Sequence, residues 1–472
     1  MSTKRRLRFY GVDAAKYFGA DSVHALLNDD DPWEEVMAVG AVEKGQFRVF
    51  ELIDSVRAID LISNSVAHYA AKTGRLRVLK WLQERQSLDL RAEDDIFRTV
   101  VESAAMGGHT VVLQWFYEEG LLDSELLLAS GDAWIVAACY GHLSVLQWAH
   151  STFGGVLSTI DSKRSLASHS VRHLHVLQWL HSIGQMELDR ADPSVGWNLA
   201  HLAAHDGHLE VLQWLHSLGS ASFEEVDFHG WNVALILAEH NNLKALQWTY
   251  AVKALDGRKT EKTKRWNIAH VAARGGHFAL LQWLHSIGML DVNALDAHGS
   301  SLAHLASNDG HFNIVRWLYE ANLWRPDPIV SFSAASRGSK STLIWLHSIN
   351  ALDINENDKQ GKNVAHLAAR AGSVSILQWL HSLDLLDARN EGWYVEHFLA
   401  HYGRIEALKT YHAQGKLSPH VLTHAGETIA HLASKNGCFQ VMEWLRSMRL
   451  VDETATTKDG FTAAQLSPMA PK

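Results

Sequence analysis

Histidine and tryptophan are the residues of this sequence whose number and spacing could support chemistry, with 30 His and 18 Trp among 472 residues. Two pairs, His201 with His205 and His397 with His401, have the i, i+4 spacing that places two imidazoles on one helix face, as in some zinc sites. A zinc site, however, needs three or four convergent ligands with partners of their own. One His of each pair recurs at regular intervals along the chain, which favours a structural role. We therefore expect no bound metal.

Tryptophan rings could offer stacking platforms for bases or sugars. Eleven of the 18 nevertheless recur at one position, namely Trp81, Trp115, Trp148, Trp179, Trp214, Trp248, Trp283, Trp317, Trp345, Trp379 and Trp444. This Trp lies on the apolar side of a short helical pattern, opposite small residues such as Ala200 and Ala203. Such a large-against-small arrangement indicates core packing between neighbouring units.

Composition argues against several classes of protein. The 43 Lys and Arg against 52 Asp and Glu give a formal net charge of −9, which argues against a nucleic-acid binder. Two cysteines, Cys139 and Cys438, cannot supply a disulfide framework or a Cys-based zinc cluster. The basic run within residues 258–265 is interrupted by Glu261 and favours a solvated loop over a phosphate site.

Signals for export, membrane insertion and catalysis are missing. No apolar segment of signal-peptide length follows the basic start, and the longest uncharged stretch, residues 133–160, is broken by Gly, His and Gln. No hydrolase elbow, phosphate-binding Gly-rich loop, kinase or protease motif occurs. We therefore expect a cytoplasmic or, more broadly, intracellular protein with no membrane contact, no enzymatic activity and no cofactor.

The recurring Trp defines a period. Trp81 and Trp444 are 363 residues apart, and the twelve units between them have an average spacing of 33 residues. Thr410 takes the Trp place in one unit, and a thirteenth, weaker unit with Leu52 in that place comes before the others. A fixed period of this size indicates a stacked array of repeats instead of separate globular domains.

Residues 197–219 show the pattern of one unit most clearly. The Ala-rich stretch 199–206 favours a helix, and Gly207 supplies the left-handed residue that ends it. The apolar side chains between Val211 and Leu215 then form one face of a second short helix. Each unit is therefore predicted to be a helix–turn–helix pair whose apolar face is covered by its neighbours, in an all-α fold.

The unit at residues 290–317 resembles an ankyrin repeat. The likeness lies in the turn formed by Asp296 and Gly299, in the helix-opening His304 and in the Gly-His pair before the second helix. It covers about residues 36–467, with Asn-Leu-Ala-His and similar sequences in place of the family's Thr-Pro-Leu-His. The Val-Leu-Gln-Trp-Leu-His-Ser second helix is similar to divergent ankyrin families of protists and giant viruses. The resemblance implies an ankyrin-type solenoid of about 12–13 repeats with short finger loops.

The resemblance also implies a role for the helix-opening histidines, which would bond backbone groups and tie the loops of adjacent repeats together. This set comprises His68, His201, His270, His304, His366, His397 and His431. Proline is absent from the first helical residue, where it would preset the φ angle. Helix starts are therefore expected to be less uniform than in the family.

Four units carry a second Trp just after the turn. In ankyrin proteins this place resembles a variable position on the inner, concave face that contacts partners, and aromatic residues are common at binding hot spots. The candidate partner-binding residues are Trp197, Trp231, Trp266, Trp393, Phe228, His229 and His298. The alternative is that each ring folds down on the neighbouring hairpin as packing.

These features predict a non-enzymatic interaction module or scaffold that binds another protein, of unidentified kind, along its finger and first-helix face. We expect a monomer. The alternative is a structural, spring-like spacer without a dedicated ligand, and the exposed aromatic strip favours the binder. A third class, a metal enzyme, would need a convergent pocket of His, Asp and Glu.

The predicted domains are a leader or capping segment at residues 1–35, the repeat array at 36–467 and a C-terminal tail at 468–472. The array is irregular between Trp317 and Trp345, where the spacing falls to 28 residues and the Asp-x-x-Gly turn is missing.

Two prolines, Pro326 and Pro328, prevent a continuous helix in this irregular unit, and Phe332 stands in the place of the helix-opening His. Because a weak interface is where a repeat array loses cooperativity first, the sequence predicts an energetic break near residues 320–332. The alternative is a deletion that a shorter loop absorbs.

Overall fold

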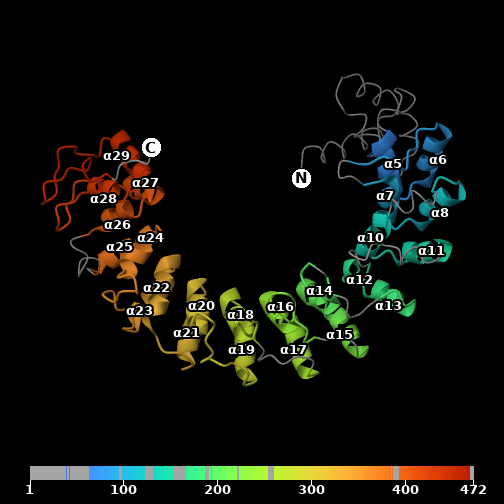
Figure 1. Cartoon of the computed structure of the whole chain (residues 1–472), viewed down its shortest axis with the longest axis horizontal. Helices are drawn as coiled ribbons and strands as arrows, with labels where there is room; N and C mark the ends of the chain where they lie inside the picture. The colour runs from blue at the N-terminus through green and yellow to red at the C-terminus, as the bar shows by residue number, and fades with distance from the viewer. Residues whose placement is uncertain are drawn as a thin grey trace, which may run out of the picture. The chain divides into compact units, whose positions relative to one another are not determined.

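Helices make up the regular structure of the described chain. The computed structural model describes Val39, Val42 and residues 63–94, 98–122, 131–153, 166–186, 191–192, 194–219, 223–253, 260–383, 385 and 393–467. Within these residues there are 24 helices and no strand, with two isolated bridges, Glu93 to Thr99 and Thr456 to Thr462 (Figure 1). The all-α repeat architecture is thus confirmed. The leader, the tail and, apart from Val39 and Val42, the thirteenth unit lie outside the described residues.

The chain divides into two compact units, Met1–Phe228 and His229–Lys472. The described part of the first unit contains five helix pairs: α5 (Ser63–Lys72) with α6 (Leu76–Glu84), α7 (Val100–Gly107) with α8 (Thr110–Glu118), α10 (Gly131–Cys139) with α11 (Leu143–Phe153), α12 (Leu166–His169) with α13 (Leu174–Ser182), and α14 (Leu199–Asp206) with α15 (Leu209–Ser217).

The described part of the second unit contains seven pairs. They are α16 (Val233–Glu239) with α17 (Leu243–Ala251), α18 (Ile268–Gly275) with α19 (Phe278–Ser286), α20 (Leu302–Asn308) with α21 (Phe312–Glu320), α22 (Pro328–Arg337) with α23 (Lys340–Ser348), α24 (Val364–Arg370) with α25 (Val374–Ser382), α26 (Val395–His401) with α27 (Ile405–Ala413), and α28 (Ile429–Lys435) with α29 (Phe439–Ser447). Within each unit the first helices of successive pairs pack side by side, as Figure 1 shows for α16 to α28.

Side-chain caps fix where several first helices begin. The backbone N–H of His201 donates to Oδ1 of Asn198 at 3.1 Å, and the backbone N–H of Asn198 donates to Nδ1 of His201 at 3.3 Å. This is a capping box in which His takes the place of the usual Glu or Gln. The same box opens α18, α20 and α28. In these repeats the helix starts are therefore alike despite the missing proline, contrary to the expected irregularity.

A second histidine, placed just before the second helix, ties successive repeats together. Nε2 of His109 bonds the backbone oxygen of Lys72 at 3.0 Å, and Nε2 of His311 bonds that of Arg274 at 2.8 Å. The preceding repeat makes room for this ring, because a Cβ on Gly74 would lie 2.5 Å from the His109 imidazole. The Gly-His pair served only as a family signature in the sequence, and the structure gives it this physical role.

The recurring Trp lies at the edge of the core. Trp115 is buried, whereas Trp214, Trp283 and Trp379 are half-buried. The three half-buried rings each meet an aromatic side chain of the preceding repeat edge-on, as Trp214 does with His181 at 5.8 Å between centroids and an interplanar angle of 82°. The Trp position therefore joins neighbouring second helices, although most of its members are less buried than core residues.

We predict that Trp214→Ala lowers the free energy of unfolding by about 2–3 kcal/mol, somewhat less than a fully buried aromatic truncation, because the ring is half-buried. The matched control is Gln213→Ala, at an exposed position of the same helix. Urea unfolding measures both. Equal, negligible shifts in the two midpoints would show that the Trp position does not contribute to packing.

The shortened finger before α22 is fastened by Asp327. Its side chain caps α22 by accepting from the backbone N–H of Val330 at 3.3 Å, with Pro328 in the first turn. Oδ2 of Asp327 also bonds Nε2 of His304 at 2.7 Å and accepts from Nε1 of Trp324 at 3.2 Å. Asp327 therefore supplies the acceptor for His304 that a finger carbonyl supplies in longer repeats.

The break near residues 320–332 stays a prediction. We expect Asp327→Ala to raise both hydrogen exchange and proteolytic cutting within these residues, because one side chain holds the loop, the helix start and the preceding repeat. Cutting there should leave two resistant fragments. Uniform protection of the segment in both the variant and the parent chain would rule the break out.

Candidate partner-binding site

Two of the four second-position tryptophans bond the turn of the next repeat. Nε1 of Trp197 donates to Oδ2 of Asp227 at 2.9 Å, and Nε1 of Trp266 donates to Oδ2 of Asp296 at 3.2 Å. Both aspartates are buried. In both repeats the indole N–H thus binds the first residue of the next finger turn, and the indole ring adds apolar contact.

The two tryptophan rings that make these bonds differ in exposure. Trp266 is only 6% exposed, and Lys264 Nζ and the Arg274 guanidinium lie 4.3 Å and 5.0 Å from its ring centroid. Trp197 is half-buried and lies 5.1 Å from the ring of His205. A partner could therefore reach Trp197 directly but would meet the cations above Trp266 first.

The remaining finger candidates lie at the surface. Phe228 is 69% exposed, and His229 and His298 are exposed. The backbone N–H of His298 donates to Oδ1 of Asp296 at 2.8 Å, so the turn holds the imidazole outward. Trp231 is half-buried and lies in the second unit, while Trp197 belongs to the first. The continuous strip of Trp197, Trp231 and Trp266 stays a prediction.

Trp393 is the centre of an aromatic cluster on the first helices of the second unit. Its ring lies 5.1 Å from Phe398, 5.0 Å from His401 and 6.1 Å from His366. His401 in turn packs against Tyr402 at 4.7 Å and 82°. We call Lys362, His366, Trp393, His401 and Tyr402 the Trp393 cluster.

Lys362 extends this cluster with a cation. Its Nζ donates to the Tyr402 hydroxyl at 3.2 Å and lies 5.0 Å from the centroid of the same ring. The residue comes just before Asn363, the cap of α24, whereas Tyr402 follows the end of α26. The long side chain thus links the start of one first helix to the end of the next.

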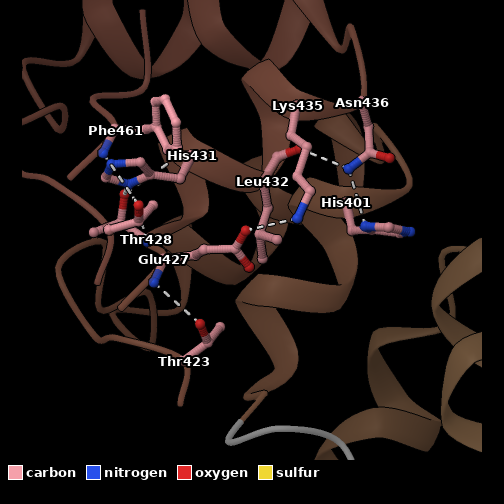
Figure 2. Close-up of polar contacts among 10 residues, drawn as sticks. His401, Thr423, Glu427, Thr428, His431, Leu432, Lys435, Asn436 and Phe461 are labelled. Carbon is pink, nitrogen blue, oxygen red and sulfur yellow. Dashed lines mark hydrogen bonds and ion pairs between the residues drawn. The ribbon is translucent and has the colours of Figure 1, made fainter. Parts of the chain in front are cut away.

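Polar contacts of α28 support His401 from the other side (Figure 2). Asn436 Nδ2 donates to the Leu432 carbonyl at 2.8 Å and to Nδ1 of His401 at 3.0 Å. Lys435 Nζ pairs with the buried Glu427 at 2.9 Å, and the backbone N–H of Glu427 donates to Thr423 Oγ1 at 3.1 Å.

This geometry assigns the tautomer of His401. The carbonyl of Leu432 requires the amide nitrogen of Asn436 on its side, so the same nitrogen donates to Nδ1 of the imidazole. Nδ1 is therefore an acceptor, and the ring proton is on Nε2. In Figure 2, Nε2 of His401 points away from Asn436.

Burial keeps the histidines of this region neutral. It lowers the pKa of His366 to about 4, with further lowering by the charges of His401 and Lys362. Burial also lowers the pKa of His401, again helped by Lys362, and that of His397. Neutral imidazoles can donate from one nitrogen and accept at the other.

Three helix-opening histidines, His68, His397 and His431, bond through both ring nitrogens. Nε2 of His68, His397 and His431 each bonds a backbone oxygen 24 residues later, at 3.0 to 3.2 Å. In the repeats of His201, His270 and His366, Nδ1 lies within 2.6 to 2.7 Å of the cap Asn oxygen. Their contacts with the cap and with the next finger position the surface that carries the candidate residues.

Within the described residues, no group of three or more His, Cys, Asp or Glu side chains could hold a metal ion. A cavity of about 390 Å³ in the second unit is lined by Glu239, Val271, Arg274, Gly275, Asp309 and His311. It lies at the ends of α16, α18 and α20.

Comparison with known families decides the identity of the repeats. A family model for three ankyrin repeats matches residues 236–327, and one for many ankyrin repeats matches residues 331–381. This chain is an ankyrin repeat protein. Ankyrin repeats generally mediate protein–protein interactions and are generally not enzymes. No curated protein matches the chain in sequence, and no described helix is long and apolar enough to cross a membrane.

Sequence reasoning missed the polar members of the site, among them Lys362, Tyr402 and Asn436. One signal could have found part of it. Aligning the repeats on the left-handed glycine shows that the place two residues earlier holds Arg370, His401 and Lys435 in three successive repeats. A column of nitrogen donors at one repeat position marks a common face, although it cannot show which donors are paired.

We predict that the ankyrin array loses stability as the pH falls from about 6.5 to 4. The folded pKa of His366 lies below the ordinary value of 6.5, so the unfolded chain takes up a proton first and is favoured as acid is added. Urea midpoints at pH 7, 5.5 and 4.5 measure this. His366→Gln should have a shallower pH dependence than the parent chain, and identical slopes would contradict the prediction.

Proposed function

We propose that this ankyrin repeat protein is a non-enzymatic interaction module that binds a partner protein along the face formed by its fingers and first helices. The observation that carries the proposal is the Trp393 cluster, where half-exposed aromatic rings and hydrogen-bond donors are held on short, packed helices. Rigid aromatic side chains with polar neighbours are the composition expected of a binding hot spot. The exposed Phe228, His229 and His298, each on a finger, support the same proposal.

The alternative, a spacer without a dedicated ligand, predicts no preference for one face. Large exposed apolar residues also occur on second helices, including Val111 on α8 and Ile344 on α23. These residues lack the donors and neighbouring rings of the Trp393 cluster. The monomeric state and a cytoplasmic location remain predictions from the sequence.

Site-specific photocrosslinking tests the proposal. A benzophenone side chain placed at position 298 or 228 should capture a distinct protein from extracts of the source cells, because both positions are exposed on fingers. The matched controls carry the same group at positions 111 and 344 on second helices. The same crosslinks from all four positions, or none from any, would favour the spacer.

A further inference from the structure

We propose that the Trp393 cluster, together with Arg370 and Arg404, is the docking site for an acidic segment of the partner protein, whose Asp and Glu side chains meet its donors. The inference rests on the proposed function and specifies the chemistry of the partner at one part of the face. Four donors carry it: Lys362, Arg370, Arg404 and His401 Nε2–H.

Within the described part of the chain, the three cations of this surface form no ion pair. The ammonium of Lys362 bonds the hydroxyl and lies near the ring of Tyr402, and both of these groups are neutral. Arg370 and Arg404 are exposed, and within the described residues neither forms an ion pair. Cations that already rest on neutral partners can bind a carboxylate without first breaking an ion pair.

Three carboxylates of the described repeats around Trp393 are buried or hydrogen-bonded. Glu427 is buried and paired with Lys435. Glu396 is buried on α26, and the Asp358 side chain accepts the backbone N–H groups of Gln360 and Lys362 in its turn. Among the described residues of this surface, Lys362, Arg370 and Arg404 therefore remain outside ion pairs, although the whole chain has a formal net charge of −9.

His401 adds a neutral donor of fixed direction. Asn436 holds its Nδ1 as an acceptor, so the proton on Nε2 faces away from the network of α28 (Figure 2). The half-exposed rings of Trp393 and Tyr402 lie directly beside it. An acidic residue next to an apolar one fits this combination of donors and rings, since the rings bury apolar surface while the donors bind carboxylate.

A polyphosphate chain fits the surface less well. Nucleic-acid affinity comes mainly from neutralising many phosphates, and three cations on an acidic protein supply little of it. Carboxylate side chains need only a few charge-assisted bonds at a defined spacing. The site therefore suits an acidic peptide better than an oligonucleotide.

Fluorescence anisotropy with defined probes tests the inference. Fluorescein-labelled hexaglutamate should bind the full chain at low salt, and labelled hexalysine and a dT10 oligonucleotide should bind more weakly. The double variant K362E/R370E should weaken hexaglutamate binding at least about tenfold, because two attractive contacts become repulsive. The matched control is K244E/K416E, which changes the net charge equally at exposed positions on α17 and after α27.

Circular dichroism and urea midpoints establish that both double variants are folded. No hexaglutamate binding by the parent chain, equal weakening by both variants, or tighter binding of dT10 would each overturn the inference. Photocrosslinking at positions 228 and 298 is independent of these probes. A crosslinked partner without hexaglutamate binding would therefore refute the acidic segment and leave the proposed function intact.

Discussion

The bond between an imidazole and the backbone of the neighbouring repeat is the interaction on which the rest of this array depends. His397 shows it in full: its Nδ1 accepts from the backbone N–H of Tyr394 at the helix start, and its Nε2 bonds the Val421 carbonyl of the next finger at 3.0 Å. One ring thus fixes where a helix begins and where the following loop lies. It can do so only while neutral, which burial ensures by lowering its pKa.

The shortened finger shows how the array keeps this bond when the loop loses residues. The usual finger carbonyl is replaced by the carboxylate of Asp327, 2.7 Å from Nε2 of His304. The bond to His304 holds the pKa of Asp327 below its usual range despite the opposing effect of burial. This interface is therefore electrostatically different from the others while the helix start after it remains capped.

Much of the fold could be predicted from the sequence, because the features that determine it are local and repeated. Periodic Trp, Ala and Gly positions are enough to predict the helix pairs and the family. The surface was harder, since Trp266 and Trp393 occupy the same place in their repeats and differ in surroundings. Lys264 and Arg274 lie over one ring, whereas His401 lies beside the other. Such contacts depend on the neighbouring repeat, which a single-repeat pattern does not describe.

Two physical explanations are available for the cations at the ends of first helices, namely interaction with the helix dipole and binding of a partner. Comparison of the repeats of this chain distinguishes between them. A helix C-terminus favours a positive charge by roughly 0.3–1 kcal/mol, which could account for Arg370 and Lys435. Yet α16 ends in Glu239, so an acidic residue at this place does not prevent the helix from forming. Lys362 lies outside α24 altogether, and its ammonium rests on the Tyr402 ring after α26. Helix stability therefore permits the cations without requiring them to gather, which agrees with the proposal that this surface docks an acidic segment.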